Sequence, residues 1–408
     1  MAPSVLLLGK LQASSNKYNI MKANEVETIE PGKLRKVITP ELRTLEPIFS
    51  KAGHSIRIVG GAVRDLLLGK IPKDIDLATD ATPDKMVELF KKADIKYIPT
   101  GIKHGTVTAV IDAEQYEITT LRADTKTDGR RADVDFITSW EEDAKRRDLT
   151  YNAMSLDFKG RLYDYTGGLD DLQDKTSKFV GDPAERIKED YLRILRYFRF
   201  QSKLPSAKFD TDTLDAIKAN AGGLKKISPE RIWMETKKIL MSDNLIVILD
   251  AMNDTGVARI IGLPVGNARK ASKIVVDDAN SYLSRLAMLV DNDSLVKKWR
   301  MSNDEATILQ FMLAYKNKKI DLQTAKDMLV DGISKEKLLM TLKFQSNFQV
   351  ARQIADWNPP EFPVLGRDFI ELGMKPGPDI GYKLKQAKDL WKKSGYKLSK
   401  EQILAKLK

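Results

Sequence analysis

The spacing of hydrophobic positions changes near residue 170 of the chain. Before that point, apolar and β-branched residues gather in short runs that are typical of strands. We expect strands at 55–60, 74–79, 105–111, 116–121 and 134–139. The intervening segment 82–94 has helical spacing, with Thr82 as N-cap and Pro83 in the first turn. Strands that alternate with helices predict a small α/β domain.

Two further elements flank these strands. Residues 33–53 have helical spacing, and Gly53 ends the pattern. Residues 155–165 predict a hairpin that turns at Lys159 and Gly160 and closes the domain.

After residues 167–172 the spacing becomes helical and stays so to the end of the chain. We expect amphipathic helices at 182–204, 210–224 and 228–241, the last with Ser228 as N-cap. Three prolines at 359, 360 and 363 predict a break before the final segment. The chain is therefore expected to be α+β, with the strands confined to its first part.

The composition excludes several classes of protein. Hydrophobic residues make up 42% and charged residues 31% of the 408 residues, and no apolar run approaches the roughly 18 residues of a membrane span. Cysteine is absent, which excludes disulfides, thiolate catalysis and cysteine-ligated zinc. His54 and His104 are the only histidines, which excludes a histidine-rich metal site.

The net charge of +11 is concentrated near the end of the chain. Residues 263–408 hold 26 basic against 17 acidic residues, and the last 28 residues hold nine lysines against two acids. This excess indicates either a polyanion partner such as nucleic acid or a solvated lysine surface. Residues 1–24 lack acidic residues, which fits either an organelle-targeting leader or a disordered N-terminus.

Two aspartates one residue apart, Asp74 and Asp76, are the first candidates for chemistry. Because they lie in an expected strand, their side chains should point to the same face and could share divalent ions. Two-metal phosphoryl transfer uses ions about 3.5–4 Å apart, one at the attacking hydroxyl and one at the triphosphate. Glu117, in another expected strand, could supply a third carboxylate. By itself an Asp-x-Asp pair does not establish a catalytic site.

The sequence VGGAVRD at 59–65 predicts a strand-to-helix turn just before the aspartates. Gly60 and Gly61 lack a Cβ, so their backbone N–H groups can approach a phosphate at the helix N-terminus. Arg64, one turn into the helix, could bind the same phosphate with its forked guanidinium. The alternative is a tight turn that happens to contain an arginine, but the Asp-x-Asp that follows favours phosphate binding.

Five motifs together resemble the CCA-adding tRNA nucleotidyltransferases, of the class shared by bacteria and eukaryotes. They read GGAVRDLLLG…DIDLAT, KHGT, RRDLTYNAM, EDYLRILRYFRF and SPERIWMETKKIL. Their order and spacing are similar to those of the family over roughly residues 33–262. The resemblance extends more faintly to the C-terminus, where LWKKSGYKLSKEQIL is similar to the tail of animal members.

The resemblance implies a polymerase beta-like nucleotidyltransferase head followed by a helical neck, body and tail. The expected segments are a leader at 1–32, the head at 33–170, the neck at 171–262, the body at 263–355 and a basic, tRNA-binding tail at 356–408. It also implies that C, C and A are added to the 3′ end of tRNA from CTP and ATP, without a nucleic-acid template. Two Mg²⁺ ions would be held by Asp74 and Asp76.

Residues 186–200 are expected to form one continuous helix with a polar stripe. Arg186, Asp190 and Arg193 would fall within about 60° of one another, with Arg196 at the border of the stripe and Arg199 pointing away from it.

An acceptor beside a donor, as in Asp190 and Arg193, can distinguish the bases. Cytosine and adenine both present an amino group beside a ring-nitrogen acceptor, whereas guanine and uracil present the opposite polarity, which would leave groups unpaired at about 1–3 kcal/mol each. The alternative is a surface i,i+3 ion pair. The resemblance assigns base selection to Glu189, Asp190 and Arg193, with Arg196 as a neighbouring candidate.

Two other segments enter through the resemblance. Arg147 matches a residue that contacts the triphosphate in the family, and Asn152 lies in the same motif; from the residues alone, this is a basic helix end with Asp148 as a capping residue. Residues 123–133 are polar and contain glycine, which predicts a loop. In the family such a loop contributes to the switch from C to A addition, and the candidates here are Asp128, Gly129, Arg130 and Arg131.

Three alternatives exist. One is a CC-only enzyme, but such enzymes lack the loop that residues 127–133 are expected to supply. The other two stay open. A bacterial-type poly(A) polymerase shares the head and neck motifs but typically extends further with an arginine-rich tail. The second is a catalytically inactive RNA-binding protein, against which the intact Asp74, Asp76, Arg64 and Arg147 argue. We expect immature tRNA as a partner, no membrane, a monomer or homodimer, and a soluble protein of mitochondria, cytoplasm or nucleus.

Overall fold

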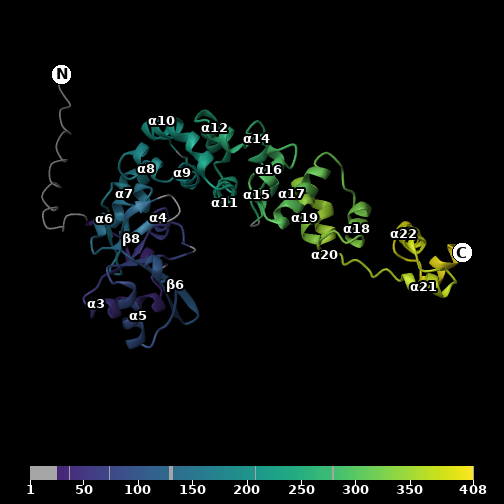
Figure 1. The fold of residues 1–408 in the computed structure, drawn as a ribbon, viewed down its shortest axis with the longest axis horizontal. Helices are drawn as coiled ribbons and strands as arrows, with labels where there is room; N and C mark the ends of the chain where they lie inside the picture. The colour runs from purple at the N-terminus through teal and green to yellow at the C-terminus, as the bar shows by residue number, and fades with distance from the viewer. Residues whose placement is uncertain are drawn as a thin grey trace, which may run out of the picture. The chain divides into compact units, whose positions relative to one another are not determined.

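The computed structural model describes residues 25–35, 37–72, 74–127, 132–206, 208–277 and 280–407. The chain divides into two compact units, with the boundary between Val265 and Gly266. Strands occur only in the first unit among the described residues, and helices make up the rest (Figure 1). This distribution confirms the α+β class expected from the change in hydrophobic spacing.

The first unit is built on an eight-stranded sheet in the order β1-β10-β9-β2-β3-β6-β5-β4. Its strands are β1 (Glu25–Thr28), β2 (Ile56–Val59), β3 (Leu77–Thr79), β4 (Lys96–Gly101), β5 (Thr106–Ile111), β6 (Glu114–Thr120), β9 (Ser155–Leu156) and β10 (Arg161–Tyr163). β3 and β6 are parallel, and the other neighbours are antiparallel. A separate ribbon pairs β7 (Arg122–Thr127) with β8 (Ala132–Phe136).

Three details of the strands differ from expectation. The run at 74–79 forms a strand only from Leu77, because the two aspartates are poor strand formers; Asp76 still accepts a backbone hydrogen bond from Val59. Residues 25–28, within the expected leader, form β1 and pair with β10. Much of the expected loop at 123–133 lies in the β7–β8 ribbon, and its residues 128–131 lie outside the described residues.

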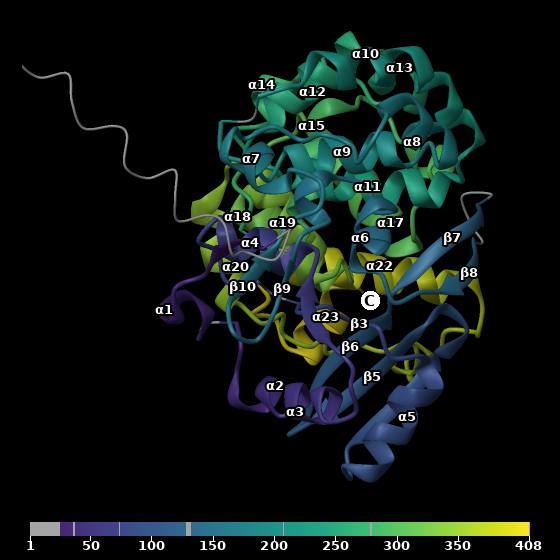
Figure 2. The same ribbon diagram turned by 90° about the vertical axis from the view of Figure 1, so that its left-hand side faces the viewer.

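The same part of the unit contains short helices: α1 (Pro31–Leu34), α2 (Pro40–Arg43), α3 (Leu45–Ser50), α4 (Gly61–Leu67), α5 (Pro83–Lys92), α6 (Trp140–Lys145) and α7 (Gly168–Gln173), with 3₁₀ turns η1 (Ile102–His104) and η2 (Thr150–Asn152). α5 begins as expected, with the Thr82 hydroxyl accepting from Lys85 N at 3.3 Å. The single helix expected at 33–53 is instead α1, α2 and α3, because Thr39 caps a new start at Pro40. Figure 2 shows α3 and α5 on the same side of the sheet, and their Phe49 and Phe90 rings lie 6.0 Å apart.

The rest of the first unit is helical: α8 (Pro183–Glu189), α9 (Arg193–Gln201), α10 (Thr211–Asn220), η3 (Ala221–Lys226), α11 (Pro229–Leu240), α12 (Leu245–Asp254) and α13 (Val257–Ile261). The expectation of one helix over 186–200 is wrong. Asp190 has an extended backbone, with φ −152° and ψ 106°, and separates α8 from α9. Its carboxylate accepts from Leu192 N at 3.0 Å and from Arg231 Nη2 at 2.7 Å, so side-chain contacts stabilise a break that helical spacing does not reveal.

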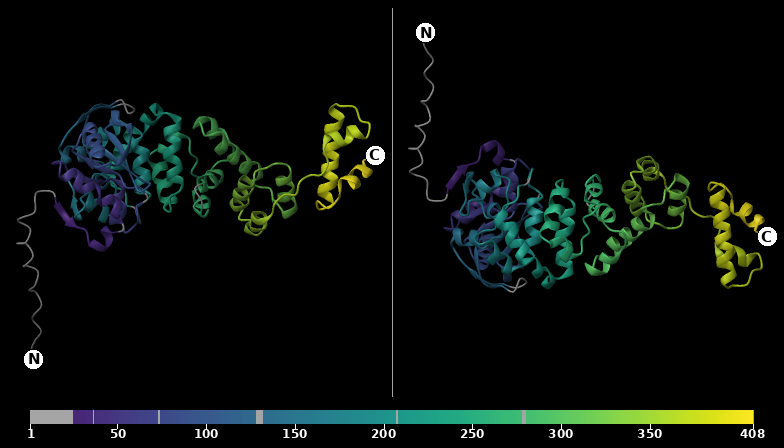
Figure 3. Two further views of the ribbon diagram at one scale, coloured as in Figure 1. Left: turned by 90° about the horizontal axis from the view of Figure 1, so that it is seen from below. Right: turned by 90° about the horizontal axis from the view of Figure 1, so that it is seen from above.

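The second unit is entirely helical within its described residues (Figure 3). Its helices are α14 (Ala268–Ala271), α15 (Ser281–Leu289), α16 (Ser294–Lys298), α17 (Asn303–Tyr315), α18 (Leu322–Val330), α19 (Lys335–Phe344), α20 (Phe348–Asp356), α21 (Gly366–Glu371), α22 (Pro378–Lys393) and α23 (Lys400–Lys406). The proline-containing stretch between α20 and α21 lacks helix, as expected. Beyond it, Phe369, Trp391 and Ile403 belong to a separate small core.

The lysines near the C-terminus fall into two groups. Four are partly buried and contact other parts of the unit: Lys383, Lys388, Lys392 and Lys400. For example, Lys388 and Lys392 both pair with Asp331 at the end of α18. Four others are exposed: Lys385, Lys393, Lys397 and Lys406. Among the lysines that the structure describes from residue 381 onward, only the second group is fully available to a polyanion. No helix in the described part of the chain is long and apolar enough to cross a membrane.

Candidate active site

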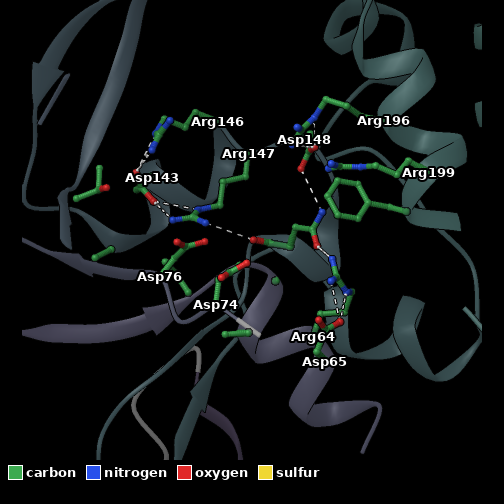
Figure 4. Close-up of a pocket in the computed structure, with 18 of the residues that line it drawn as sticks. Arg64, Asp65, Asp74, Asp76, Asp143, Arg146, Arg147, Asp148, Arg196 and Arg199 are labelled. Carbon is green, nitrogen blue, oxygen red and sulfur yellow. Dashed lines mark hydrogen bonds and ion pairs between the residues drawn. The ribbon is translucent and has the colours of Figure 1, made fainter. Parts of the chain in front are cut away.

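A cavity of about 1020 Å³ lies in the first unit, lined by residues of the sheet region and of α4, α9 and α11. Ten arginines and lysines line it against six aspartates. Figure 4 shows Asp74 and Asp76 on one side and Arg196 and Arg199 on the other. An excess of cationic groups around a cavity favours a polyanionic ligand.

Asp74 and Asp76 lie side by side in the cavity wall (Figure 4). Burial raises the pKa of Asp76, and the negative charges of Glu117 and Asp74 raise it further, while Arg147 opposes them. The expected convergence of the two aspartates is therefore present, although it comes from the segment before β3 rather than from the strand. Glu117 is exposed on β6, near enough for its charge to act on Asp76.

Arg147 is held by Asp143, a residue that our sequence interpretation did not single out. Asp143 is 3% exposed, and its carboxylate accepts from Arg147 Nε and Nη2 at 3.1 and 3.0 Å and from Arg146 Nε at 2.8 Å. Although burial opposes ionisation, the guanidinium groups of Arg147 and Arg146 hold the pKa of Asp143 below its usual value. The i,i+3 and i,i+4 spacing at the end of α6 was the available signal.

The Gly60–Gly61 turn lies at the cavity wall and begins α4. Gly60 has φ +69°, which favours glycine, so the turn is of the expected kind. Arg64 lines the same cavity but is only 1% exposed. Its Nη1 donates to Asn152 Oδ1 at 2.8 Å and its Nη2 to Asp65 Oδ1 at 2.7 Å. These bonds orient the guanidinium, and they bring Asn152 into the site beside it.

The expected base-selecting residues meet at the break between α8 and α9. Asp190 and Arg193 both line the cavity, but each has another partner: Asp190 pairs with Arg231, and Arg193 pairs with Glu189. Their interaction is therefore not the surface i,i+3 pair that the sequence left open.

Two arginines connect this break to the segment that carries Arg147. The guanidinium of Arg186 donates to the backbone carbonyls of Arg146 and Arg147 and to the carboxylate of Glu189. Arg196 donates to Asp148 Oδ2 through Nε at 2.8 Å, and its charge holds the pKa of the buried Asp148 carboxyl below its usual value despite the opposing effect of burial.

Comparisons with known proteins agree with this arrangement. Residues 56–177 match the family described as "Poly A polymerase head domain", and residues 208–264 match the one described as "Probable RNA and SrmB- binding site of polymerase A". The chain is 40% identical over 401 residues to the "CCA tRNA nucleotidyltransferase 1, mitochondrial" of Mus musculus, across 93% of this chain and 92% of the mouse protein. The chain belongs to the CCA tRNA nucleotidyltransferase family.

Bacterial relatives extend the comparison. The CCA-adding enzyme of Ligilactobacillus salivarius is 34% identical, across 84% of this chain and 90% of that protein. The crystal structure of the Bacillus stearothermophilus CCA-adding enzyme in complex with CTP has a TM-score of 0.77 at 28% identity, across 90% of this chain and 97% of that chain. The fold class and the nucleotidyltransferase class expected from the sequence are thus confirmed.

Sequence reasoning left Arg199 and its neighbour Phe200 of α9 out of the site of this nucleotidyltransferase. Arg199 was expected to point away from the polar stripe and brace another segment. It does pair with Glu235 of α11 at 3.0 Å, but it also lines the cavity beside Phe200, with its guanidinium carbon 4.0 Å from the ring centroid. The helical projection was wrong because it included Arg186 and Asp190, which precede α9; within α9 alone, Arg193, Arg196 and Arg199 fall on one face.

Proposed function

We propose that this nucleotidyltransferase adds C, C and A to the 3′ end of tRNA, using CTP and ATP and no nucleic-acid template. The observation that carries the proposal is one cavity in which an aspartate pair faces Arg146 and Arg147, which directly follow α6, and the arginines of α9. The names of the relatives support tRNA as substrate, and the CTP complex of the bacterial neighbour supports CTP.

The aspartate pair fits divalent metal ions. Asp74 and Asp76 offer hard oxygen ligands. Burial raises the pKa of Asp76 most, and the negative charges of Glu117 and Asp74 add to the increase, so a bound cation would offset the repulsion between these carboxylates. Among the described residues no group of three or more acidic or histidine side chains could enclose an ion. Two carboxylates suit Mg²⁺, which is usually bound by one or two carboxylates together with substrate phosphates. Two bound Mg²⁺ ions would supply activation of the attacking hydroxyl and charge neutralisation at the triphosphate.

The residues on the other side of the aspartates are suited to the triphosphate. Arg147 is held by Asp143 so that its guanidinium remains at the cavity wall beside Asp76. Gly60 and Gly61 leave the wall without side chains at the start of α4, and Arg64 is oriented there by Asn152. Fixed cations stabilise negative charge that develops during transfer without having to reorganise, which favours catalysis.

Base selection is assigned to the residues around the helix break. Asp190 supplies an acceptor and Arg193 a donor in the same cavity as the aspartate pair. Both bonds that Arg193 makes to Glu189 and to Arg186 O use Nη1, so its other N–H groups can turn to a base. Glu189 is the partner that orients Arg193, and Arg196 extends the cationic face. This polarity accepts cytosine and adenine and opposes guanine and uracil.

Three further parts of the proposal have different support. Glu117 as a third catalytic carboxylate rests on its strand position and on its charge near Asp76, and tRNA binding by the exposed lysines near the C-terminus rests on their charge. Residues 128–131 as the loop that switches from C to A addition rest on the family alone. The name of the mouse relative supports a mitochondrial location, which import of the full chain into isolated mitochondria would test.

The function is tested by incubating the protein with Mg²⁺ and a tRNA that ends at its discriminator base. With CTP alone two residues should be added, and with CTP and ATP together a single A should follow. The match to a poly(A) polymerase head favours one rival outcome, a long A ladder from ATP alone, which would replace CCA addition by polyadenylation. The absence of any extension would leave only RNA binding.

A further inference from the structure

We propose that Gly223 and Tyr191 are positioning residues for base selection: the Tyr191 ring rests on the backbone at Gly223 and thereby fixes the orientation of Asp190 in the cavity. The inference rests on the proposed function, because it concerns the same base-selecting site. Neither residue lines the cavity within the described chain, so both would act through Asp190.

Tyr191 lies at the centre of the break between α8 and α9. The residues on either side of it, Asp190 and Leu192, both line the cavity. A displacement of the Tyr191 ring therefore moves the backbone from which the Asp190 carboxylate projects. The opposite end of that ring contact is η3, where Lys226 Nζ lies 5.5 Å from the ring centroid.

Gly223 makes this contact possible because it has no side chain. A Cβ at residue 223 would lie 1.9 Å from Tyr191 Cδ1 and 2.0 Å from Cε1, well below the 3.4 Å at which ordinary van der Waals contact begins. The ring would have to move by about 1.5 Å, the difference between these distances. Glycine is required at residue 223 because a larger residue would not fit beside the Tyr191 ring.

The η3 backbone cannot easily move away instead. Ala221 and Leu224, on either side of the glycine pair, are buried at 2% and 0% exposure. Shifting η3 would withdraw these side chains from a packed core, which is costly. Tyr191 is only partly buried, so its ring can move with less loss of packing, and a side chain at residue 223 should be accommodated by a shift of the break that carries Asp190.

Base selection is sensitive to such a displacement. Asp190 discriminates only if its acceptor oxygen meets the amino group of the base, and its orientation is already defined by Leu192 N and Arg231. Moving a positioning group by about 1 Å can reduce a rate by about a hundredfold when the geometry is exacting. A displaced Asp190 should penalise the correct bases more than the wrong ones, and the ratio between them should fall.

The test compares Gly223→Ala with Gly222→Ala in the full chain. Gly222 is the adjacent residue of η3, is exposed, and has no heavy atom within 4 Å of a built Cβ, so it controls for helix propensity and local backbone. For each variant, kcat/KM is measured for CTP, ATP, UTP and GTP on tRNA that ends at its discriminator base or at CC. We expect the CTP-over-UTP ratio to fall by about tenfold or more in Gly223→Ala and to stay within about twofold in Gly222→Ala.

A uniform loss of kcat/KM for all four nucleotides in Gly223→Ala, with the ratio unchanged, would overturn the inference. If Gly223→Ala does not fold, Tyr191→Ala decides: it removes the ring without a clash, and it too should lower the ratio, whereas an unchanged ratio overturns the inference. Where both variants fold, the double variant should have nearly the same CTP-over-UTP ratio as Tyr191→Ala alone, because both substitutions disrupt the same contact. If the wild-type protein discriminates between bases and these variants discriminate equally well, the inference is refuted but the proposed function is not. If the wild-type protein transfers no nucleotide, the proposed function is refuted.

Discussion

Replacing Asp143 by asparagine should destabilise the first unit and weaken nucleotide binding. The substitution keeps the size of the side chain but removes the charge that two guanidinium groups share. It also places an amide N–H donor or a neutral amide oxygen against the guanidinium groups of Arg146 and Arg147, which are paired with a carboxylate in the wild-type protein. Arg147, which we assign to the triphosphate, would lose the contact that fixes its direction.

The size of the effect follows from burial. Removing one partner of a buried ion pair costs about 3–5 kcal/mol. Here the Asp143 side chain is 4% exposed but Arg146 and Arg147 are 18% and 20% exposed beside an open cavity, so water can partly solvate the orphaned cations. We therefore expect a loss of about 2–3 kcal/mol in the free energy of unfolding at pH 7.

The pH dependence of the unfolding free energy provides a second test. The pKa of Asp143 in the folded protein lies below its ordinary value, so its contribution to stability is present above that ordinary value, about 3.9, and is lost as the pH falls through the folded pKa. The difference between wild type and Asp143→Asn should consequently be the same at pH 7 and pH 5 and shrink only below about pH 4.

The free energy of unfolding of the first unit can be measured by hydrogen exchange of the β6 amides as a function of urea, because exchange of these amides reports opening of that unit. Glu142→Gln is the matched control: it is the exposed neighbour on α6 and should change stability by less than about 0.5 kcal/mol. KM for CTP should rise in Asp143→Asn and not in the control. A loss below about 0.5 kcal/mol, or one that shrinks between pH 7 and pH 5, would refute the reasoning.

Three further outcomes are expected. Asp76→Asn should lower Mg²⁺-dependent transfer by about a thousandfold while leaving tRNA affinity within about twofold, and near-normal turnover would contradict the two-metal assignment. Arg193→Ala should reduce the preference for CTP and ATP over UTP and GTP in single-turnover assays; an unchanged preference would place selection elsewhere. Affinity for tRNA should fall steeply with salt, and the double variant Lys385→Gln, Lys393→Gln should lower the slope by about one to two, whereas an unchanged slope would mean that these exposed lysines do not contact RNA.

Local signals in the sequence predicted a good part of the fold. Thr82 caps α5 because a threonine before Pro83 determines a helix start from neighbouring residues alone. The Gly60 turn also follows from local backbone chemistry, since a positive φ favours glycine. The aspartate pair was found because two carboxylates so close together are costly without a ligand.

Contacts between residues distant in sequence explain what was missed. The break at Asp190 depends on Arg231, 41 residues later, and on a ring contact with Gly223, so periodicity alone favoured a continuous helix. That error shifted the expected face and left Arg199 outside the site. Asp143 could have been found from its spacing to Arg146 and Arg147, but its burial could not.

The most direct test of the account measures binding of the four nucleotide triphosphates to the protein in the absence of any RNA, with Mg²⁺ present. If side chains alone choose the base, CTP and ATP should bind at least about tenfold more tightly than UTP and GTP, and Arg193→Ala should abolish the difference. Equal binding of all four nucleotides, with selective incorporation appearing only when tRNA is added, would contradict selection by Asp190 and Arg193 and assign it to the RNA.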